Sequence, residues 1–147
     1  MPKLLLFVPC QKVLIDQDNT ISTVSIIQEM WLEAGATVPP DFQAAVRWDV
    51  VTLWFRLPED DGRTFEQVVM LLTSDGTMTS HTKLQFSMST PFHRTLSYMY
   101  GFQVGQPGTH HLELKLKDMA NESSFIQEHT FPMLLNHRTK PETGRTA

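Results

Sequence analysis

The fold is decided by the stretch that begins Phe102-Gln103-Val104-Gly105-Gln106-Pro107-Gly108 and continues, after Thr109, as His110-His111-Leu112-Glu113-Leu114-Lys115-Leu116-Lys117. Apolar and polar residues alternate on both sides of the Pro-Gly turn. Successive side chains of a strand point to opposite faces, so this alternation indicates a strand with one buried face and one exposed face. Two such segments joined by a Pro-Gly turn predict two antiparallel strands.

The same alternation recurs along most of the chain and predicts about eight strands. They span residues 3–15 with an interruption at Pro9, then 20–27, 49–57, 65–73, 78–88, 95–104, 110–117 and 125–131. The segment 28–48 contains two adjacent prolines and is expected to be irregular. The sequence therefore predicts an all-β fold, a two-sheet antiparallel β-sandwich with immunoglobulin-like or C2-like topology.

The domain organisation follows from the length and from the distribution of apolar residues. A chain of 147 residues is typical of one domain. We expect a single domain over residues 1–135 and a disordered tail over 136–147, which carries a proline and a glycine and almost no apolar residue. The alternation also predicts one core formed by Leu53, Phe55, Val69, Leu71, Leu112 and Leu114.

Composition excludes several function classes. The net charge is −4 and the 12 basic residues are scattered, which argues against nucleic acid as a partner. No apolar run approaches the roughly 18 residues of a membrane span. With one cysteine, no zinc-finger spacing and no phosphate-binding loop, the sequence predicts a cytoplasmic protein without a cofactor.

Several short stretches resemble a family of small uncharacterised bacterial β-sandwich proteins of unknown function. The family's sequences carry an aromatic residue two positions after the glycine of the late hairpin, where this chain has His110. The resemblance implies a fold and no particular activity. The stretches that carry it are Lys3-Leu4-Leu5-Leu6-Phe7-Val8-Pro9-Cys10, Asp16 to Asn19, Thr20-Ile21-Ser22, Arg47-Trp48, Leu53-Trp54, Asp75-Gly76, Gly101-Phe102 and Pro107-Gly108.

Aromatic residues suggest a binding surface. Trp48 and Trp54 share one face of the strand 49–57 and its approach, opposite the face assigned to the core, while Tyr98 and Tyr100 share a face of 95–104 with Phe102. If exposed, these rings would stack on a flat ligand or pack against a partner protein. If both faces are covered, they belong to the core. The first alternative predicts a non-enzymatic interaction or ligand-binding module.

Acidic turns suggest a second function, a calcium-dependent binding module. In a succession of antiparallel strands, alternate turns lie at the same end of the sandwich. This count brings together the turns 16–19, 58–62 and 118–122. Carboxylates from separate loops are the ligands that calcium prefers, although Asp is also common in turns without an ion. The candidate ligands are Asp16, Asp18, Asp60, Asp61 and Asp118.

An enzyme of unrecognised type remains the third alternative. Cys10 lies beside a proline in an apolar segment, a setting typical of a small buried residue rather than of a nucleophile. Alternation places His110 in the core or at the end of a sheet and leaves His111 exposed. A surface metal site would need His111 and Glu113 to meet His129 from the next strand.

Overall fold

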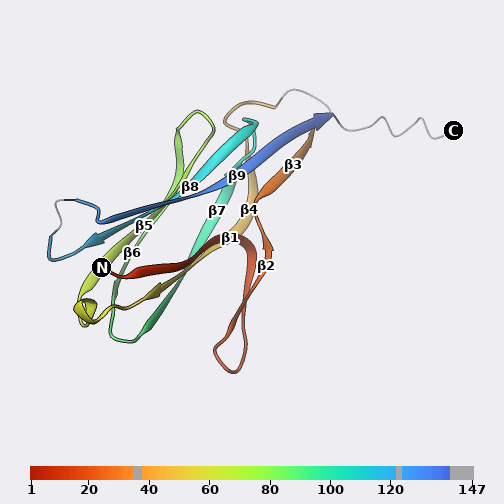
Figure 1. Ribbon diagram of the computed structural model, residues 1–147. Coiled ribbons are helices and arrows are strands. Elements are labelled where there is room, and N and C mark those ends of the chain that lie inside the picture. The colour runs from red at the N-terminus through yellow and green to blue at the C-terminus, as the bar shows by residue number, and fades with distance from the viewer. Residues whose placement is uncertain (35–37, 122–123, 140–147) are drawn as a thin grey trace.

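The computed structural model describes residues 1–34, 38–121 and 124–139 and shows an all-β protein (Figure 1). Within these residues the one helical element is a 3-10 turn, η1, at Pro58–Asp60. Nine strands account for the rest of the regular structure. They are β1 (Lys3–Ile15), β2 (Ile21–Ile26), β3 (Glu29–Ala34), β4 (Gln43–Phe55), β5 (Thr64–Leu72), β6 (Met78–Ser87), β7 (Phe92–Gln103), β8 (Gly108–Asp118) and β9 (Gln127–Thr139).

The strands form two sheets. Sheet A has four strands in the order β2-β1-β4-β7, and sheet B has five in the order β3-β9-β8-β5-β6. Neighbouring strands are antiparallel with one exception. Strand β3 runs parallel to β9, with Glu29 opposite Leu134 and Trp31 opposite Asn136. The antiparallel expectation is therefore wrong at this pair.

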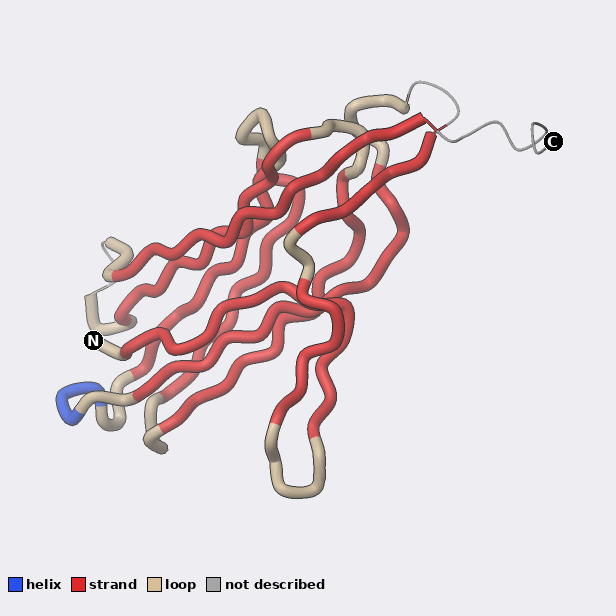
Figure 2. Tube along the Cα trace, turned by 45° about the vertical axis from the view of Figure 1, so that its right-hand side comes forward, coloured by secondary structure: helices blue, strands red, loops and turns tan. Residues whose placement is uncertain are grey.

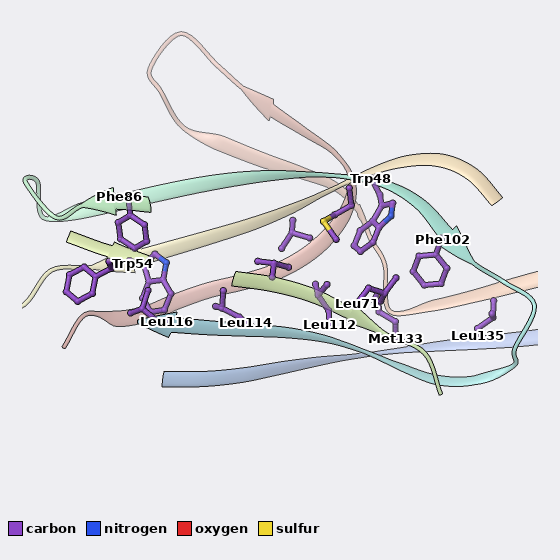
Figure 3. Close-up of a cluster of buried hydrophobic side chains, with 14 of the residues drawn as sticks. Trp48, Trp54, Leu71, Phe86, Phe102, Leu112, Leu114, Leu116, Met133 and Leu135 are labelled. Carbon is purple, nitrogen blue, oxygen red and sulfur yellow. The ribbon is translucent and has the colours of Figure 1, made fainter. Parts of the chain in front are cut away.

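The core fills the space between the two sheets (Figure 3). Sheet A contributes Trp48, Val50 and Trp54 from β4, and sheet B contributes the alternate leucines 112, 114 and 116 of β8. Burying a side chain of this kind stabilises the folded state by about 1.5–3 kcal/mol. The predicted core is confirmed for Val69, Leu71, Leu112 and Leu114.

Strand β4 presents the face opposite to the one that the sequence predicts. Leu53 and Phe55 lie partly exposed on its outer face and are not part of the core cluster. Both faces of β4 are rich in apolar residues, so alternation alone does not say which face is inside. Even the outer face is covered in places, since Val51 is fully buried there.

Strand β1 bends where it leaves β4. Its first part, from Lys3 to Cys10, pairs with β4 from Phe55 to Asp49, and its second part pairs with β2. Figures 1 and 2 show the resulting β1–β2 hairpin projecting from the body of the protein. The guanidinium of Arg94 on β7 ties the tip of this hairpin by donating to the backbone oxygen and to Oδ1 of Asn19, at 3.0 and 2.9 Å.

Two expectations about irregular segments need correction. The segment 28–48 is not irregular throughout, because it contains β3 and the first residues of β4. These strands form by pairing with β9 and β7, which are distant in the sequence. Strand β9 continues through Thr139, four residues past the predicted domain boundary at 135. The remainder of the predicted tail, 140–147, lies outside the described residues.

Candidate functional site

The candidate site lies at the fork, defined here as the point beside Cys10 and Asp49 where β1 leaves β4. Beyond the fork, β4 continues to Gln43 with β7 on one side. No described strand pairs with its other side. Two pockets open at the fork, and both are lined by Gln11 and Arg47.

The first of these, the inner pocket, has a volume of about 510 Å³. Its floor is formed by the buried rings of Trp48 and Phe102, which meet edge to face with their centroids 5.7 Å apart. The Trp48 Nε1 donates a hydrogen bond to the Gly101 carbonyl at 3.0 Å, so this indole is held in place. The remaining lining residues are Gln11, Ser25, Ile26, Ile27, Glu29, Met30, Val46 and Arg47. The inner pocket is thus mostly apolar with a few polar groups.

The second, the outer pocket, has a volume of about 380 Å³ and lies between the β1–β2 hairpin and the outer face of sheet A. Val13 and Ile15 line it from the hairpin, and Leu96 and Tyr98 line it from β7. Its charged residues are Lys12, Arg47 and Asp49. Two cations and one anion give the outer pocket a net positive charge of one.

Arg47 connects the charged and aromatic groups of the fork. Its guanidinium carbon lies 4.5 Å from the centroid of the Tyr98 ring, a cation–π contact. Its Nε is 3.9 Å from Oδ1 of Asp49, too far for a hydrogen bond, and no described residue donates one to that buried oxygen. Tyr98 and the neighbouring Tyr100 are 56% and 78% exposed. The outer face of sheet A therefore carries two exposed tyrosines, of which Tyr98 lines the outer pocket.

A bulge explains why the two tyrosines are outside while Phe102 is inside. Simple alternation places all three residues on one face. In the structure Gly101 has a φ of 76°, which favours glycine, and Ala44 and Arg47 of β4 pair with Phe102 and Tyr100, so that β4 holds one extra residue. The bulge turns Phe102 into the core, where it forms part of the floor of the inner pocket.

Of the two alternatives for Trp48 and Trp54, the structure supports burial in the core and not an exposed aromatic face. Their side chains are 2% and 0% exposed. Trp54 lies within the core, with its ring centroid 6.4 Å from that of Phe86 and its Nε1 donating to the Gln67 Oε1. The inward parity of β4 places both indoles between the sheets. Trp48 nevertheless lines the inner pocket.

The candidate calcium ligands at the end of the sheets are paired with cations. Asp61 accepts a hydrogen bond from Arg56 at 2.8 Å, and Asp118 is bonded to Arg63. The turn 58–62 and Asp118 do lie at the same end, because Arg63 directly follows that turn. Asp61 and Asp118 therefore each form a salt bridge with a different arginine, and they do not converge on a common calcium site.

The other three candidate carboxylates have different surroundings. The buried side chain of Asp60 accepts the backbone N–H of Leu57 at 3.1 Å, and its Oδ1 lies 3.3 Å from the N-terminal ammonium. Asp16 accepts the backbone N–H of Asp18 at 2.9 Å within the hairpin turn, and hydrogen bonds from Thr20 lower its pKa. Asp18 is exposed in the same turn. No group of three potential metal ligands occurs among the described residues.

The candidate nucleophile is a buried thiol. Cys10 is fully buried, as the sequence predicts. Burial raises the pKa of its thiol above the usual range, and the nearby negative charge of Asp49 raises this pKa further. Both effects disfavour the thiolate, which is the reactive form. The environment of Cys10 is therefore that of a packing residue.

The histidines do not converge on a metal site. His110 is fully buried, as predicted, and its Nε2 donates to the Gln106 carbonyl at 3.1 Å. His111 is exposed. The register places His129 opposite Leu114, a core residue, and its ring lies against Trp54 with centroids 6.3 Å apart. His129 thus faces the core, away from His111, and the suggested surface site is not formed.

Comparisons with known proteins provide no evidence on function, so a proposal has to rest on the fold and the fork. No protein-family model matches the chain, and a search of curated proteins finds no relative. Among the described residues, no helix is long and apolar enough to cross a membrane.

Proposed function

We propose that this chain is a non-enzymatic binding module of β-sandwich architecture that takes its ligand at the fork. The two sheets and their common core support the β-sandwich part of the proposal. An immunoglobulin-like or C2-like topology remains a prediction. A single buried cysteine is consistent with the cytoplasmic location that the sequence predicts.

One observation carries the functional part: a pocket of about 510 Å³ with an aromatic floor and a second pocket lined by the exposed Tyr98 share Arg47 as a lining residue. A volume of this size is typical of sites for small molecules. An exposed tyrosine contributes a large apolar area at a small cost in conformational entropy. The residues that line the fork therefore resemble those of a binding surface.

The lining of the fork defines the kind of ligand that would bind there. The apolar walls and the indole and phenyl rings of the floor favour an apolar or aromatic body. Arg47 stands between the two pockets and offers a guanidinium for an anionic group. We expect a ligand that combines an apolar body with an acidic group.

The aromatic sulfonate 1-anilinonaphthalene-8-sulfonate combines these two properties and serves as the probe. Its fluorescence increases in apolar sites, so a titration with the folded protein measures binding. We expect saturable binding at micromolar concentrations, with amide shifts in an NMR spectrum confined to residues of the fork. Substituting Val46→Phe fills the inner pocket and should weaken binding about tenfold, which corresponds to about 1.4 kcal/mol.

A matched control is Leu84→Phe, which enlarges another exposed apolar residue, on β6 of sheet B. This variant should bind the probe as the wild-type protein does. Thermal unfolding of each variant checks that the fold is retained. Equal binding by Val46→Phe and the wild type, or NMR shifts spread over sheet B, would show that the fork is not the binding site.

A further inference from the structure

Strand β4 presents an unpaired backbone edge next to the inner pocket. From Asp49 onwards it pairs with β1, but over residues 43–48 its one described neighbour is β7. Backbone N–H and C=O groups along an unpaired edge are a template for another strand. The edge lies beside both pockets of the fork, because Val46, Arg47 and Trp48 line the inner pocket and Arg47 also lines the outer one.

Charge explains in part why β1 does not continue along this edge. The register of β1 and β4 is regular from the Leu6–Leu53 pair to the Cys10–Asp49 pair. Continued by two residues, the same register would place Lys12 directly opposite Arg47. Like charges in that position destabilise a pair of antiparallel strands. Instead, β1 turns away and pairs with β2.

A foreign strand with an acidic residue in that position would reverse the repulsion. Opposite residues of an antiparallel pair lie on the same face of the sheet. The residue opposite Trp48 would therefore point to the inner pocket, and the next residue, opposite Arg47, would point to the outer pocket. The buried Trp48 lines the inner pocket, whereas Leu96 and Tyr98, on the outer face of β7, line the outer pocket. The two pockets therefore open on opposite faces of sheet A.

We infer that the ligand of the fork is an extended peptide that adds to the unpaired edge of β4 as an antiparallel strand. Its recognition element is an apolar residue followed directly by aspartate or glutamate. The apolar side chain occupies the inner pocket and the carboxylate binds Arg47. Main-chain hydrogen bonds supply affinity and the two pockets supply specificity, as in other cases of strand addition. This inference rests on the proposed function and specifies its ligand class.

A phage library of random heptapeptides, selected on the folded full-length protein, tests the motif. We expect enrichment of an apolar residue followed by Asp or Glu. Selection on Arg47→Glu should enrich Lys or Arg in place of the acid, because the substitution reverses the charge. Selection on Lys83→Glu, an exposed position on β6, serves as the control and should return the wild-type motif.

Backbone methylation tests strand addition independently of any protein variant. Two versions of a selected peptide carry N-methyl groups on alternate sets of backbone amides. In an added strand, one set of N–H groups faces β4 and the other faces solvent. We expect one version to bind at least about tenfold more weakly than the parent peptide while the other retains most of its affinity.

The outcomes separate this inference from the proposed function. Equal affinity of both methylated peptides, a motif unchanged by Arg47→Glu, or no enriched motif overturns strand addition. If the fluorescent probe still binds at the fork in any of these cases, the binding-module proposal stands with a different ligand class. If neither peptide nor probe binds there, both proposals fail.

Discussion

Trp54 of sheet A donates a hydrogen bond through its Nε1 to Oε1 of Gln67 of sheet B, at 2.8 Å. The same oxygen accepts a hydrogen bond from Thr52 at 3.1 Å, and the Gln67 Nε2 donates to Thr95 at 3.0 Å. All four residues are buried. The amide of Gln67 therefore connects two strands of sheet A through the middle of the core and fixes how the two sheets face each other.

Replacing Gln67 with alanine should destabilise the protein more than the loss of side-chain volume alone would. The substitution leaves the indole N–H of Trp54 buried without an acceptor, and an unsatisfied buried group costs about 1–3 kcal/mol. Urea denaturation of Gln67→Ala measures the loss. Gln85→Ala, at an exposed position of β6, is the control and should lie within about 0.5 kcal/mol of the wild type. Similar losses in both variants would show that the network contributes little.

The sequence predicts the strands well where alternation is strict, and less well where both faces are apolar. Strand 110–117 has one clear apolar face, and the structure confirms Leu112 and Leu114 as core residues. On β4, Val50 and Trp54 compete with Val51, Leu53 and Phe55, and the choice depends on which face meets sheet B. Strand β3 was missed because its parallel pairing with β9 joins residues far apart in the chain.

The fork could be predicted only in part. The shared face of Tyr98 and Tyr100 is visible in the alternation, and the structure leaves both residues exposed. The importance of Arg47 depends on its stacking on Tyr98, a cross-strand contact that needs the register of β4 and β7. The unpaired edge of β4 exists because β1 bends away at Cys10, and local sequence contains no signal for that point beyond the adjacent Pro9.

The corrected face of β4 leads to a prediction about two leucines. Leu114 is fully buried, whereas Leu53 is partly exposed on the outer face. Leu114→Ala should cost about 2–5 kcal/mol, because it leaves a cavity in the core. Leu53→Ala should cost less than half as much, since solvent already reaches that side chain. Urea denaturation of the two variants compares them, and a larger loss for Leu53→Ala would restore the original assignment of the faces.

Gly105 should tolerate no side chain, because the backbone of Pro39 and Pro40 lies against it. A Cβ atom at this position would lie 2.0 Å from the Pro39 carbonyl oxygen and 2.5 Å from that of Pro40. We expect Gly105→Ala to lower the melting temperature markedly or to prevent folding. The comparison is Gly76→Ala, where no atom lies within 4 Å and the positive φ of 86° accounts for a cost of about 1–2 kcal/mol. A smaller effect at Gly105 than at Gly76 would contradict this close approach.

The attachment of the β1–β2 hairpin should depend on Arg94. Its guanidinium holds the hairpin tip through Asn19, and an isolated two-stranded hairpin is marginally stable in water. We expect Arg94→Ala to increase amide hydrogen exchange across residues 21–26 while exchange in β8 remains slow. Lys83→Ala on the other sheet is the control. Unchanged exchange in β2 would indicate that the hairpin is held by its packing on sheet A instead.

His110, which is buried, and His93, which is partly buried, should make the protein less stable in mildly acidic solution. Burial lowers the pKa of His110 and of His93, the latter stacked on Phe86 with ring centroids 4.4 Å apart. In the unfolded chain both imidazoles take up a proton below about pH 6.5, whereas the folded protein disfavours their charged forms. The unfolded state therefore binds more protons just below that pH. Consequently, this contribution to stability is complete above about pH 6.5 and is lost as the pH falls towards the lowered pKa values.

Urea denaturation at a series of pH values between about 7.5 and 5 measures this loss. The free energy of unfolding should decrease across the series in the wild-type protein. His110→Gln keeps a donor for the Gln106 carbonyl but does not titrate, so its stability should fall less steeply with acid. His111→Gln, at the exposed neighbouring position, should follow the wild-type curve. If His110→Gln also follows that curve, burial of His110 does not cause the pH dependence.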